Sequence, residues 1–227
     1  MKPHSDIRIQ KLTIGRELAP LAVIDNLVAD ADELVEMAAT KMFGSVASFY
    51  PGVRSKAPLT YHQFVIGNLR ELFVGYFGLA SSSLRVTSCH FSVVTTPPEK
   101  LEPLQTIPHI DSHEINQLAF VHYLFRRDLG GTAFYRHRRT GFEFIDAARK
   151  AEYFAYVAEE RGGPDKPAQG YINGDTALYE QIGRQDGVFN RMLVYRRNSL
   201  HSGCIGPEFD FNPDPRKGRL SLNGFLA

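Results

Sequence analysis

The chain has 227 residues, and 43% of them are hydrophobic, which is enough to form a core of ordinary size. Its 26 lysines and arginines nearly balance its 25 aspartates and glutamates, so the net charge of +1 creates no general attraction for nucleic acid or for an acidic membrane. Two cysteines are too few for a disulfide framework, and no apolar run is long enough to cross a bilayer or to form a secretion signal. We therefore expect a cytoplasmic protein with reduced thiols and with no membrane or nucleic-acid partner.

The N-terminal part is expected to contain two short strands and a helix. Apolar residues alternate loosely over residues 7–24, which predicts two strands separated by Pro20. Asp30 stands at the N-cap of a helical pattern that extends over about residues 31–43. The turn-rich stretch at residues 49–55 contains an aromatic pair and one arginine. It fits either a substrate loop or a surface connection, and the surface connection is slightly favoured.

A second helix and a long strand are expected between residues 68 and 95. Asn68 and Glu71 form a capping-box pair, and apolar residues follow at helical spacing: Leu69, Leu72, Phe73, Tyr76 and Phe77. Such a stripe is typical of a buried helix face, so we assign it to the core and not to a cofactor site. β-branched and aromatic residues predict a strand over residues 84–95, in which the lone His90 is interpreted as a hydrogen-bonded structural residue.

The second half of the chain is expected to consist mainly of strands. A nearly continuous apolar run predicts a strand buried on both faces at residues 116–125, and the Gly-Gly pair at residues 130–131 predicts a tight hairpin turn into the next strand. A pattern of charged and aromatic residues predicts a helix from about residue 143 to residue 160. Further strands are predicted at residues 191–197 and 219–227.

Six basic residues bracket the Gly-Gly turn: Arg126, Arg127, Arg136, His137, Arg138 and Arg139. Such a cluster can bind phosphate or an acidic substrate, and it is the feature that suggests a nucleic-acid substrate. A solvated hairpin end is the simpler interpretation, because Asp128 and Glu143 lie nearby and the net charge of the chain is close to zero.

A His-x-Asp motif and a later histidine are the strongest candidates for metal ligands. Residues two apart in an extended strand point to the same face, so His109 and Asp111 can converge on one point, and Pro108 keeps the approach extended. A third ligand from His201 gives two histidines and one carboxylate, the set that leaves open positions on non-haem Fe(II). His113 is a rival ligand, ranked lower because Asp111 and the serine after it favour a turn.

An arginine and a serine in the last predicted strand complete the candidate site. Arg219 can grip a dicarboxylate in bidentate fashion, and Ser221 lies on the same strand face. Zinc is disfavoured as the metal, because Cys204 follows His201 by three residues but Cys89 lies in a distant strand.

Five of these residues, in chain order, resemble the signature of the Fe(II)/2-oxoglutarate-dependent dioxygenases: His109, Asp111, His201, Arg219 and Ser221. The strand, Gly-Gly turn and strand of residues 118–135 are similar to a pattern of the same superfamily. The resemblance covers about residues 84–227, and more faintly the N-terminal part, as in prolyl-hydroxylase-like members. Within the superfamily the chain is most similar to a bacterial branch of unknown function, so the resemblance implies a chemistry and no particular substrate.

The resemblance implies a mainly β fold with flanking helices, in which the core is a double-stranded β-helix, a jelly roll of cupin-like type. We expect a single domain over residues 1–227, with N-terminal strands and supporting helices in residues 1–83. The core then occupies residues 84–227, with an insertion at about residues 140–190. Insertions at this place can build a wall of the substrate pocket.

The resemblance also implies the chemistry of the site. His109, Asp111 and His201 are expected to bind Fe(II). Arg219 and Ser221 are expected to bind the far carboxylate of the co-substrate 2-oxoglutarate. Tyr123 is either a further ligand of that carboxylate or a buried tyrosine with another partner. The enzyme would be an oxygenase that hydroxylates a small molecule or a peptide side chain and releases succinate and CO2. The presence of Asp111 favours hydroxylation over halogenation, because the iron halogenases of the superfamily lack that carboxylate.

The main alternative is a jelly roll without oxygenase activity. Such a protein would be a cupin-like binder of a metal or small ligand, or a catalytically silent relative of the dioxygenases. The usual cupin pattern has two histidines and a glutamate near the first position, whereas this chain has His109-Ile110-Asp111 without an obvious matching glutamate. The oxygenase interpretation is therefore favoured.

Overall fold

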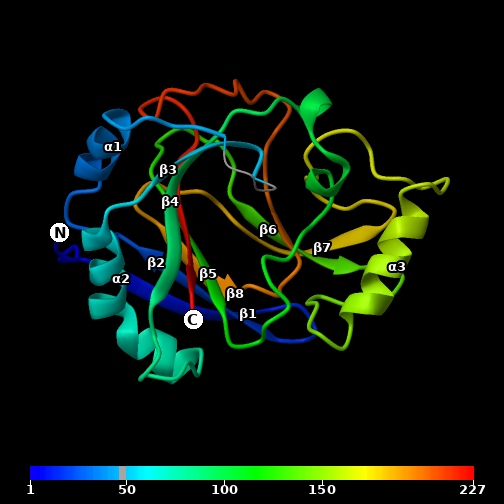
Figure 1. Ribbon diagram of the computed structural model, residues 1–227, viewed down its shortest axis with the longest axis horizontal. Helices are drawn as coiled ribbons and strands as arrows, with labels where there is room; N and C mark the ends of the chain where they lie inside the picture. Colours follow the sequence, from blue (N-terminus) through cyan, green and yellow to red (C-terminus); the bar gives the residue numbers. More distant parts are fainter. Residues whose placement is uncertain (46–49) are drawn as a thin grey trace.

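The computed structural model describes residues 1–45 and 50–227 (Figure 1). The strands are β1 (Arg8–Ile14), β2 (Ala19–Asp25), β3 (Gly52–Lys56), β4 (Val86–Val94), β5 (Leu118–Tyr123), β6 (Thr132–His137), β7 (Tyr179–Gln185), β8 (Met192–Arg196), β9 (His201–Gly203) and β10 (Leu220–Leu226). The helices are α1 (Asp32–Ala39), α2 (Leu59–Glu71) and α3 (Lys150–Glu160), with a π-helical turn at Leu72–Tyr76 and 3₁₀ turns at Pro98–Lys100 and Pro103–Gln105. No helix among the described residues is both long and apolar enough to cross a membrane.

The strands form two antiparallel sheets. The larger sheet has the order β1-β2-β8-β5-β10-β4-β3, and the smaller sheet has the order β7-β6-β9. The segment around His109 extends the smaller sheet, because His109 pairs with His201 at the outer edge of β9. From β4 onward the chain crosses repeatedly between the two sheets, which is the connectivity of a jelly roll. The predicted fold class, mainly β with flanking helices and a double-stranded β-helix core, is confirmed.

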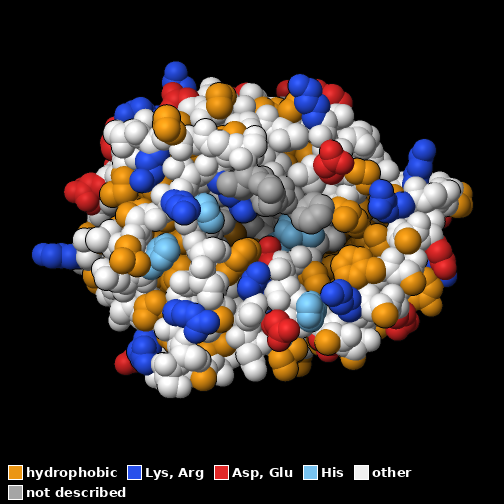
Figure 2. All heavy atoms as spheres, viewed as in Figure 1, with side chains coloured by type: hydrophobic (Ala, Val, Ile, Leu, Met, Phe, Trp, Pro, Cys, Tyr) orange, Lys and Arg blue, Asp and Glu red, His pale blue; other side chains and the backbone are white. Residues whose placement is uncertain are grey.

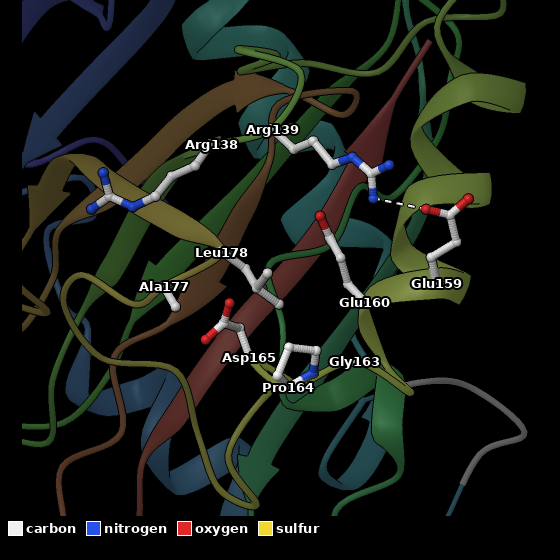
Figure 3. Close-up of a pocket in the computed structure, with 9 residues that line it drawn as sticks. All are labelled: Arg138, Arg139, Glu159, Glu160, Gly163, Pro164, Asp165, Ala177 and Leu178. Atoms are coloured by element: carbon white, nitrogen blue, oxygen red, sulfur yellow. Dashed lines mark hydrogen bonds and ion pairs between the residues drawn. The ribbon is translucent and has the colours of Figure 1, made fainter.

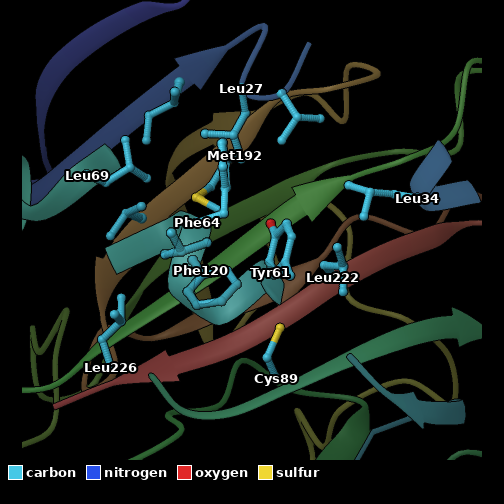
Figure 4. Packing of buried hydrophobic residues seen from close by; sticks show 14 of the residues in the cluster. Leu27, Leu34, Tyr61, Phe64, Leu69, Cys89, Phe120, Met192, Leu222 and Leu226 are labelled. Atoms are coloured by element: carbon cyan, nitrogen blue, oxygen red, sulfur yellow. The ribbon is translucent and has the colours of Figure 1, made fainter. Parts of the chain in front are cut away.

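The two sheets and the helices pack as successive layers. Figure 1 shows α1 and α2 on one side of the larger sheet, and α3 on the opposite side of the molecule beside β7. One apolar cluster joins α1 and α2 to the outer face of the larger sheet, and Figure 4 shows Tyr61 and Phe64 of α2 over Phe120 of β5 and Leu222 of β10. A second cluster lies between the sheets, and a third lies between the smaller sheet and α3.

Several predicted strands are confirmed with small shifts. The two N-terminal strands form a hairpin, but Pro20 lies inside β2 and does not separate the strands. The turn is formed instead by residues 15–18, where Gly15 and Leu18 have φ of +67° and +54°. The predicted strands at residues 84–95, 116–125, 191–197 and 219–227 correspond to β4, β5, β8 and β10.

The Gly-Gly pair at residues 130–131 does not form the predicted hairpin turn. β5 belongs to the larger sheet and β6 to the smaller sheet, so the connection crosses from one sheet to the other. Gly130 has a φ of +75°, and a Cβ at this position would overlap the carbonyl oxygen of Cys204. Glycine is therefore needed for a close approach of backbone to backbone.

The predicted start of the second helix is wrong. α2 begins at Leu59, after Pro58, and Asn68 lies well inside it, where its side chain donates to the carbonyl oxygen of Phe64. The apolar stripe assigned to the core is nevertheless largely buried, with Phe73 fully inaccessible and Leu69 and Phe77 at 1% exposure. A capping-box pattern can thus occur within a helix, because the residues before it also have a buried face.

Two other helices are shorter than predicted, and one predicted loop is partly a strand. α1 ends at Ala39, four residues early, and Met42 is 93% exposed, so it takes no part in the buried face. α3 starts at Lys150 and not near Glu143. β3 begins at Gly52, within the predicted turn-rich stretch of residues 49–55, and ends at Lys56, whereas Phe49 lies outside the described residues.

Glu143 lies outside α3 because its carboxylate has other partners. It accepts hydrogen bonds from the backbone N–H groups of Arg16 and Glu17, each at 3.0 Å, and from the guanidinium of Arg136. Its side chain is 1% exposed, and these bonds attach the β1–β2 turn to β6. Burial without such partners would be costly for a carboxylate, so tertiary contacts decide the structure of this segment.

Candidate metal centre

Backbone pairing brings the His-x-Asp motif and His201 together. The N–H of His109 donates to the carbonyl oxygen of His201 at 2.9 Å, and the N–H of His201 donates back at 3.0 Å. The N–H of Asp111 donates to the carbonyl oxygen of Arg197 at 2.8 Å. The motif is therefore held between β9 of the smaller sheet and the end of β8 of the larger sheet.

The side chains of His109, Asp111 and His201 form the candidate metal centre. One potential ligand atom from each residue lies within 4.8 Å of the other two. The Nε2 atom of His201 is 3.6 Å from Oδ2 of Asp111, and the Nε2 atom of His109 is 4.0 Å from Oδ1. Both imidazoles therefore direct the same ring nitrogen at one carboxylate, as a shared metal ion requires.

Contacts around the two rings favour a free Nε2 lone pair. The Nδ1 atom of His201 lies 2.9 Å from the carbonyl oxygen of Ser199, so this nitrogen is the donor in the neutral ring. The ring is buried and packs edge-on against Tyr195, with ring centroids 4.7 Å apart. Desolvation by the surrounding protein atoms lowers the pKa of His109, and the neighbouring His201 lowers it further. The His109 side chain is nevertheless 49% accessible. A neutral imidazole is the form that binds a metal.

Arg219 is a buried cation without a carboxylate partner among the described residues. Arg219 is 5% exposed. Its Nε and Nη2 atoms donate to the carbonyl oxygens of Leu129 and Gly131 at 2.9 and 2.7 Å. Its guanidinium carbon lies 5.5 Å from the ring centres of Tyr123 and Phe125. Because a buried charge is costly when it is unpaired, this site is suited to an anion.

A row of polar side chains crosses the inner face of the larger sheet beside Arg219. Ser221 of β10 lies opposite Tyr123 of β5 on one side and opposite Ser92 of β4 on the other. Directly paired residues point to the same face, so these hydroxyl groups share one surface. The Tyr123 hydroxyl is 2.7 Å from that of Thr132, and burial raises the pKa of Tyr123 to about 12, which keeps the phenol protonated.

Residues of the turn-rich stretch also reach this surface, although a surface connection was favoured for that stretch. Arg54 of β3 lies opposite Ser92, and its guanidinium carbon is 4.2 Å from the ring centre of Tyr50. The Tyr50 hydroxyl interacts with Ser221 and Ser92. The sequence did not predict this placement, because Pro51 and Gly52 in the middle of the stretch are typical of a turn and hide the alternation of a strand.

The other histidines and the cysteines stay outside the cluster. His113 forms a 3.6 Å contact with Glu114, and it is not among the grouped ligands of the described residues. The imidazole of His90, expected to be hydrogen-bonded, has no hydrogen bond within residues 1–45 and 50–227. Cys89 and Cys204 are both buried free thiols.

The arginines near the Gly-Gly turn are occupied by acidic partners. Arg126 pairs with Asp32, and Arg127 with Asp210. Arg136, Arg138 and Arg139 pair with carboxylates in the same way. Four of these arginines are exposed, as a solvated end would be, but Arg136 and His137 are buried, so the predicted solvated hairpin end is wrong for these two residues.

Two hollows lie away from the three grouped ligands. One has a volume of about 460 Å³ and lies between α3 and the residues around Arg138, with the Arg139–Glu159 ion pair at its side (Figure 3). The other, of about 380 Å³, lies between α1 and the loop before β10. Figure 2 shows a further depression near the centre of its face, in which histidine and acidic side chains are visible. The donor set, and not the size of a hollow, locates the candidate site.

The fold and this cluster together define a class: a double-stranded β-helix with two histidines and one aspartate grouped between its sheets. A family model described as a family of unknown function, DUF6445, matches residues 5–226, and the chain belongs to that family. No curated protein is similar to the chain in sequence.

Three solved structures are similar to this chain at TM-scores below 0.5. HygX from Streptomyces hygroscopicus with iron bound has a TM-score of 0.49 at 9% identity, over 95% of this chain and 87% of HygX. A prolyl-4-hydroxylase from Pseudomonas putida has a TM-score of 0.47 at 14% identity, over 91% of each chain. An N-substituted L-amino acid dioxygenase from Burkholderia ambifaria AMMD has a TM-score of 0.45 at 11% identity, over 96% of this chain and 94% of the other.

Proposed function

We propose that the protein is an Fe(II)- and 2-oxoglutarate-dependent oxygenase that hydroxylates a small molecule or a peptide side chain. The observation that supports this most directly is the grouping of His109, Asp111 and His201 within 4.8 Å, together with the buried Arg219, which has no carboxylate partner among the described residues. Nitrogen and carboxylate ligands of this kind suit non-haem Fe(II), and the three residues leave positions on the metal for other ligands. When bound, iron and 2-oxoglutarate supply the oxidant from O2, with release of succinate and CO2.

The protein's own residues would position and enclose these groups. His109 and His201 offer Nε2, and Asp111 offers a carboxylate oxygen. The backbone of Asp111 is held by its hydrogen bond to the carbonyl oxygen of Arg197. Arg219 would bind the far carboxylate of 2-oxoglutarate, because two backbone carbonyls already fix its guanidinium and a third nitrogen, Nη1, has no hydrogen bond to the described residues.

The surroundings of Arg219 and His201 are buried, whereas 49% of the His109 side chain is accessible. Ser221 and Tyr123 provide hydroxyl groups beside Arg219, and both are fully buried. Tyr195 and Phe134 pack against His201 from the sheets on either side. These packed and buried neighbours would hold His201 and the groups beside Arg219 in place for bound ligands.

Anaerobic titration with Fe(II) and then 2-oxoglutarate tests the proposal. The wild-type protein should develop the visible charge-transfer absorption of 2-oxoglutarate chelated to Fe(II). His109→Ala should abolish that absorption. Arg219→Ala should retain it but should need roughly tenfold or more 2-oxoglutarate, because a charge-assisted hydrogen-bond pair is lost.

His113→Ala is the matched control, because it removes an imidazole from the same segment that lies outside the cluster. It should titrate like the wild type. Metal binding without any charge-transfer absorption would contradict the oxygenase proposal and would support the cupin-like alternative.

A further inference from the structure

A second arginine faces the same interior as Arg219. Arg54 of β3 lies opposite Ser92 of β4, which lies opposite Ser221 of β10. Paired residues project to the same side of a sheet, so Arg54 extends the row of side chains that begins at Tyr123. The row therefore ends in a cation at the edge of the sheet nearest the turn at residues 50–52.

Arg54 has no ion pair with any residue in the described part of the chain. It is partly buried, and its Nε atom is inaccessible and has no hydrogen-bond partner there. Burial lowers the pKa of Arg54, and the nearby charge of Asp111 opposes that change. An arginine in this position is costly unless a ligand supplies the missing negative charge.

The next row of the same face also lacks acidic groups. Lys56 lies opposite His90, and His90 lies opposite Asn223. The Oδ1 atom of Asn223 is inaccessible and has no partner among the described residues, and Lys56 forms no ion pair with them. Burial and the charges of Arg54, Lys56 and His62 lower the pKa of His90. Among the described residues of this row, Lys56 is therefore the charged one, and the acidic charge that acts on Arg54 comes from Asp111, outside these strands.

Tyr50 interacts with both arginines. The guanidinium of Arg54 stacks over the face of the Tyr50 ring at 4.2 Å, whereas the Tyr50 hydroxyl interacts with Ser221 and Ser92, near the charge of Arg219. The charges of both arginines act on Tyr50, but Arg54 is the one that lies over the face of its ring.

Charge balance points the same way. In the proposed complex, the two carboxylates of 2-oxoglutarate and Asp111 neutralise a divalent metal and Arg219. Arg197 donates to the Gln117 side chain at 2.6 Å and to the Asp111 carbonyl oxygen at 3.1 Å, so its hydrogen bonds position the metal ligand. The charges of Arg54 and Arg197 then remain without a carboxylate partner among the described residues, but two nitrogens of Arg197 already donate to neutral acceptors.

We propose that Arg54 binds an anionic group, such as a carboxylate, of the molecule that this oxygenase modifies, and that the substrate is therefore an anion. This inference rests on the proposed function, because it assigns the second substrate of the same site. Lys56 and His90 are the residues closest to Arg54 in the register that can bind a further part of the anionic group.

Anion titrations with and without the co-substrate test this assignment. The probes are inorganic sulfate and acetate, and the readout is the 15N–1H resonances of arginine Nε in the Zn(II)-loaded protein. Without 2-oxoglutarate, sulfate should perturb the Arg54 and Arg219 resonances. With 2-oxoglutarate bound, it should perturb Arg54 and no longer Arg219. Acetate beside sulfate shows whether a planar carboxylate or a tetrahedral anion binds more tightly.

Two variants make the outcome decisive. Arg54→Gln should weaken sulfate binding to the loaded protein by roughly tenfold or more, since charge-assisted hydrogen bonds are lost, and should leave 2-oxoglutarate affinity within about twofold. Arg85→Gln, which alters an exposed arginine bonded only to the Ser83 carbonyl oxygen, should change neither.

Equal sulfate affinity in Arg54→Gln and the wild type would overturn the assignment. So would a loss of 2-oxoglutarate affinity in Arg54→Gln as large as that in Arg219→Gln, because Arg54 would then belong to the co-substrate site. If 2-oxoglutarate fails to bind the wild type while sulfate still binds at Arg54, the oxygenase proposal falls and the anion site stands.

Discussion

At the scale of single residues, His122 shows how a buried imidazole is kept neutral. It lies in β5 with no accessible surface, and its Nδ1 atom is 2.9 Å from the hydroxyl of Tyr61 in α2. Its Nε2 atom is 3.1 Å from Oδ1 of Asn190, which also accepts from the N–H of Val28. An amide oxygen only accepts, so Nε2 is the donor and Nδ1 accepts from the phenol. This network joins four segments that are far apart in the sequence.

This network predicts a pH dependence of stability. Burial lowers the pKa of His122 to about 4 from its ordinary value of 6.5, so the unfolded chain binds the proton more readily than the folded one. The contribution of neutral His122 to the free energy of unfolding is complete above pH 6.5 and is lost as the pH falls towards 4. Between pH 7.5 and pH 5 the loss should be about 2 kcal/mol. Urea unfolding of wild type and His122→Gln at both pH values measures it.

His122→Gln should be less stable than the wild type at pH 7.5, because Tyr61 and Asn190 lose a partner. The stability of His122→Gln should nevertheless fall less between pH 7.5 and pH 5. A wild type and a variant with the same loss between the two pH values would contradict the assigned neutral state. The comparison isolates His122 because the other histidines are common to both proteins.

At the scale of secondary structure, β10 connects the core to the candidate site. It pairs with β4 and β5, and its alternate residues divide between the two faces of the larger sheet. Ser221 and Asn223 face the smaller sheet, whereas Leu220 and Leu222 pack against the helices. Any shift of this strand therefore moves residues of the site and of the core together.

Gly224 of β10 is predicted to be intolerant of a side chain. It lies opposite Phe120, and an added Cβ would come within 2.2 to 2.9 Å of that ring. Gly224→Ala should destabilise the protein by about 1–3 kcal/mol, because a packed core resists added volume. Gly67→Ala in α2 is the control, since nothing lies within 4 Å of its added Cβ. It should be stabilising by about 0.5–1 kcal/mol, and denaturant unfolding measures both. A neutral Gly224→Ala would show that Phe120 can move freely.

At the scale of the whole molecule, the candidate ligands come from both sheets. His201 belongs to β9 of the smaller sheet, Arg219 immediately precedes β10 of the larger sheet, and the His-x-Asp segment lies between β9 and the end of β8. Binding at this place therefore depends on the packing of one sheet on the other. A ligand that binds only the folded protein must stabilise that packing.

Metal and co-substrate should accordingly raise the melting temperature in two steps. Each ligand at about one hundred times its Kd contributes about 2.7 kcal/mol, which corresponds to roughly 5–10 °C for a chain of this size. Arg219→Ala should retain the increment from Co(II), used as an air-stable substitute for Fe(II), and should lose most of the increment from 2-oxoglutarate. Differential scanning calorimetry of the loaded proteins measures both steps, and equal co-substrate increments in variant and wild type would contradict the role of Arg219.

Much of the larger sheet was predictable because its strands have strong local patterns. The continuous apolar run at residues 116–125 and the closing segment at 219–227 correspond to β5 and β10, both of which pair with a strand on each side. The His-x-Asp spacing and the late histidine identified residues that the structure groups within 4.8 Å. Their roles as metal ligands stay a prediction.

The errors arose where a local pattern competed with a distant contact. Glu143 resembles part of a helix in the sequence, but its carboxylate binds the β1–β2 turn and Arg136. Asn68 resembles a helix cap, but the buried residues before it extend α2 back to Leu59. Neither contact is visible within a window of a few residues, so neither could be predicted from spacing.

The expected class of fold followed from the resemblance to the Fe(II)/2-oxoglutarate-dependent dioxygenases, and the candidate ligands followed from donor residues and their spacing, which can be seen in the sequence alone. Only the tertiary structure decided which face each side chain occupies and which cations remain unpaired. Arg54 is the clearest case: in the sequence it stands in a short turn-rich stretch, and its place opposite Ser92 depends on the pairing of β3 with β4. Sheet register and burial are set by contacts between segments distant in the chain, and these contacts determine where a charge lacks a partner.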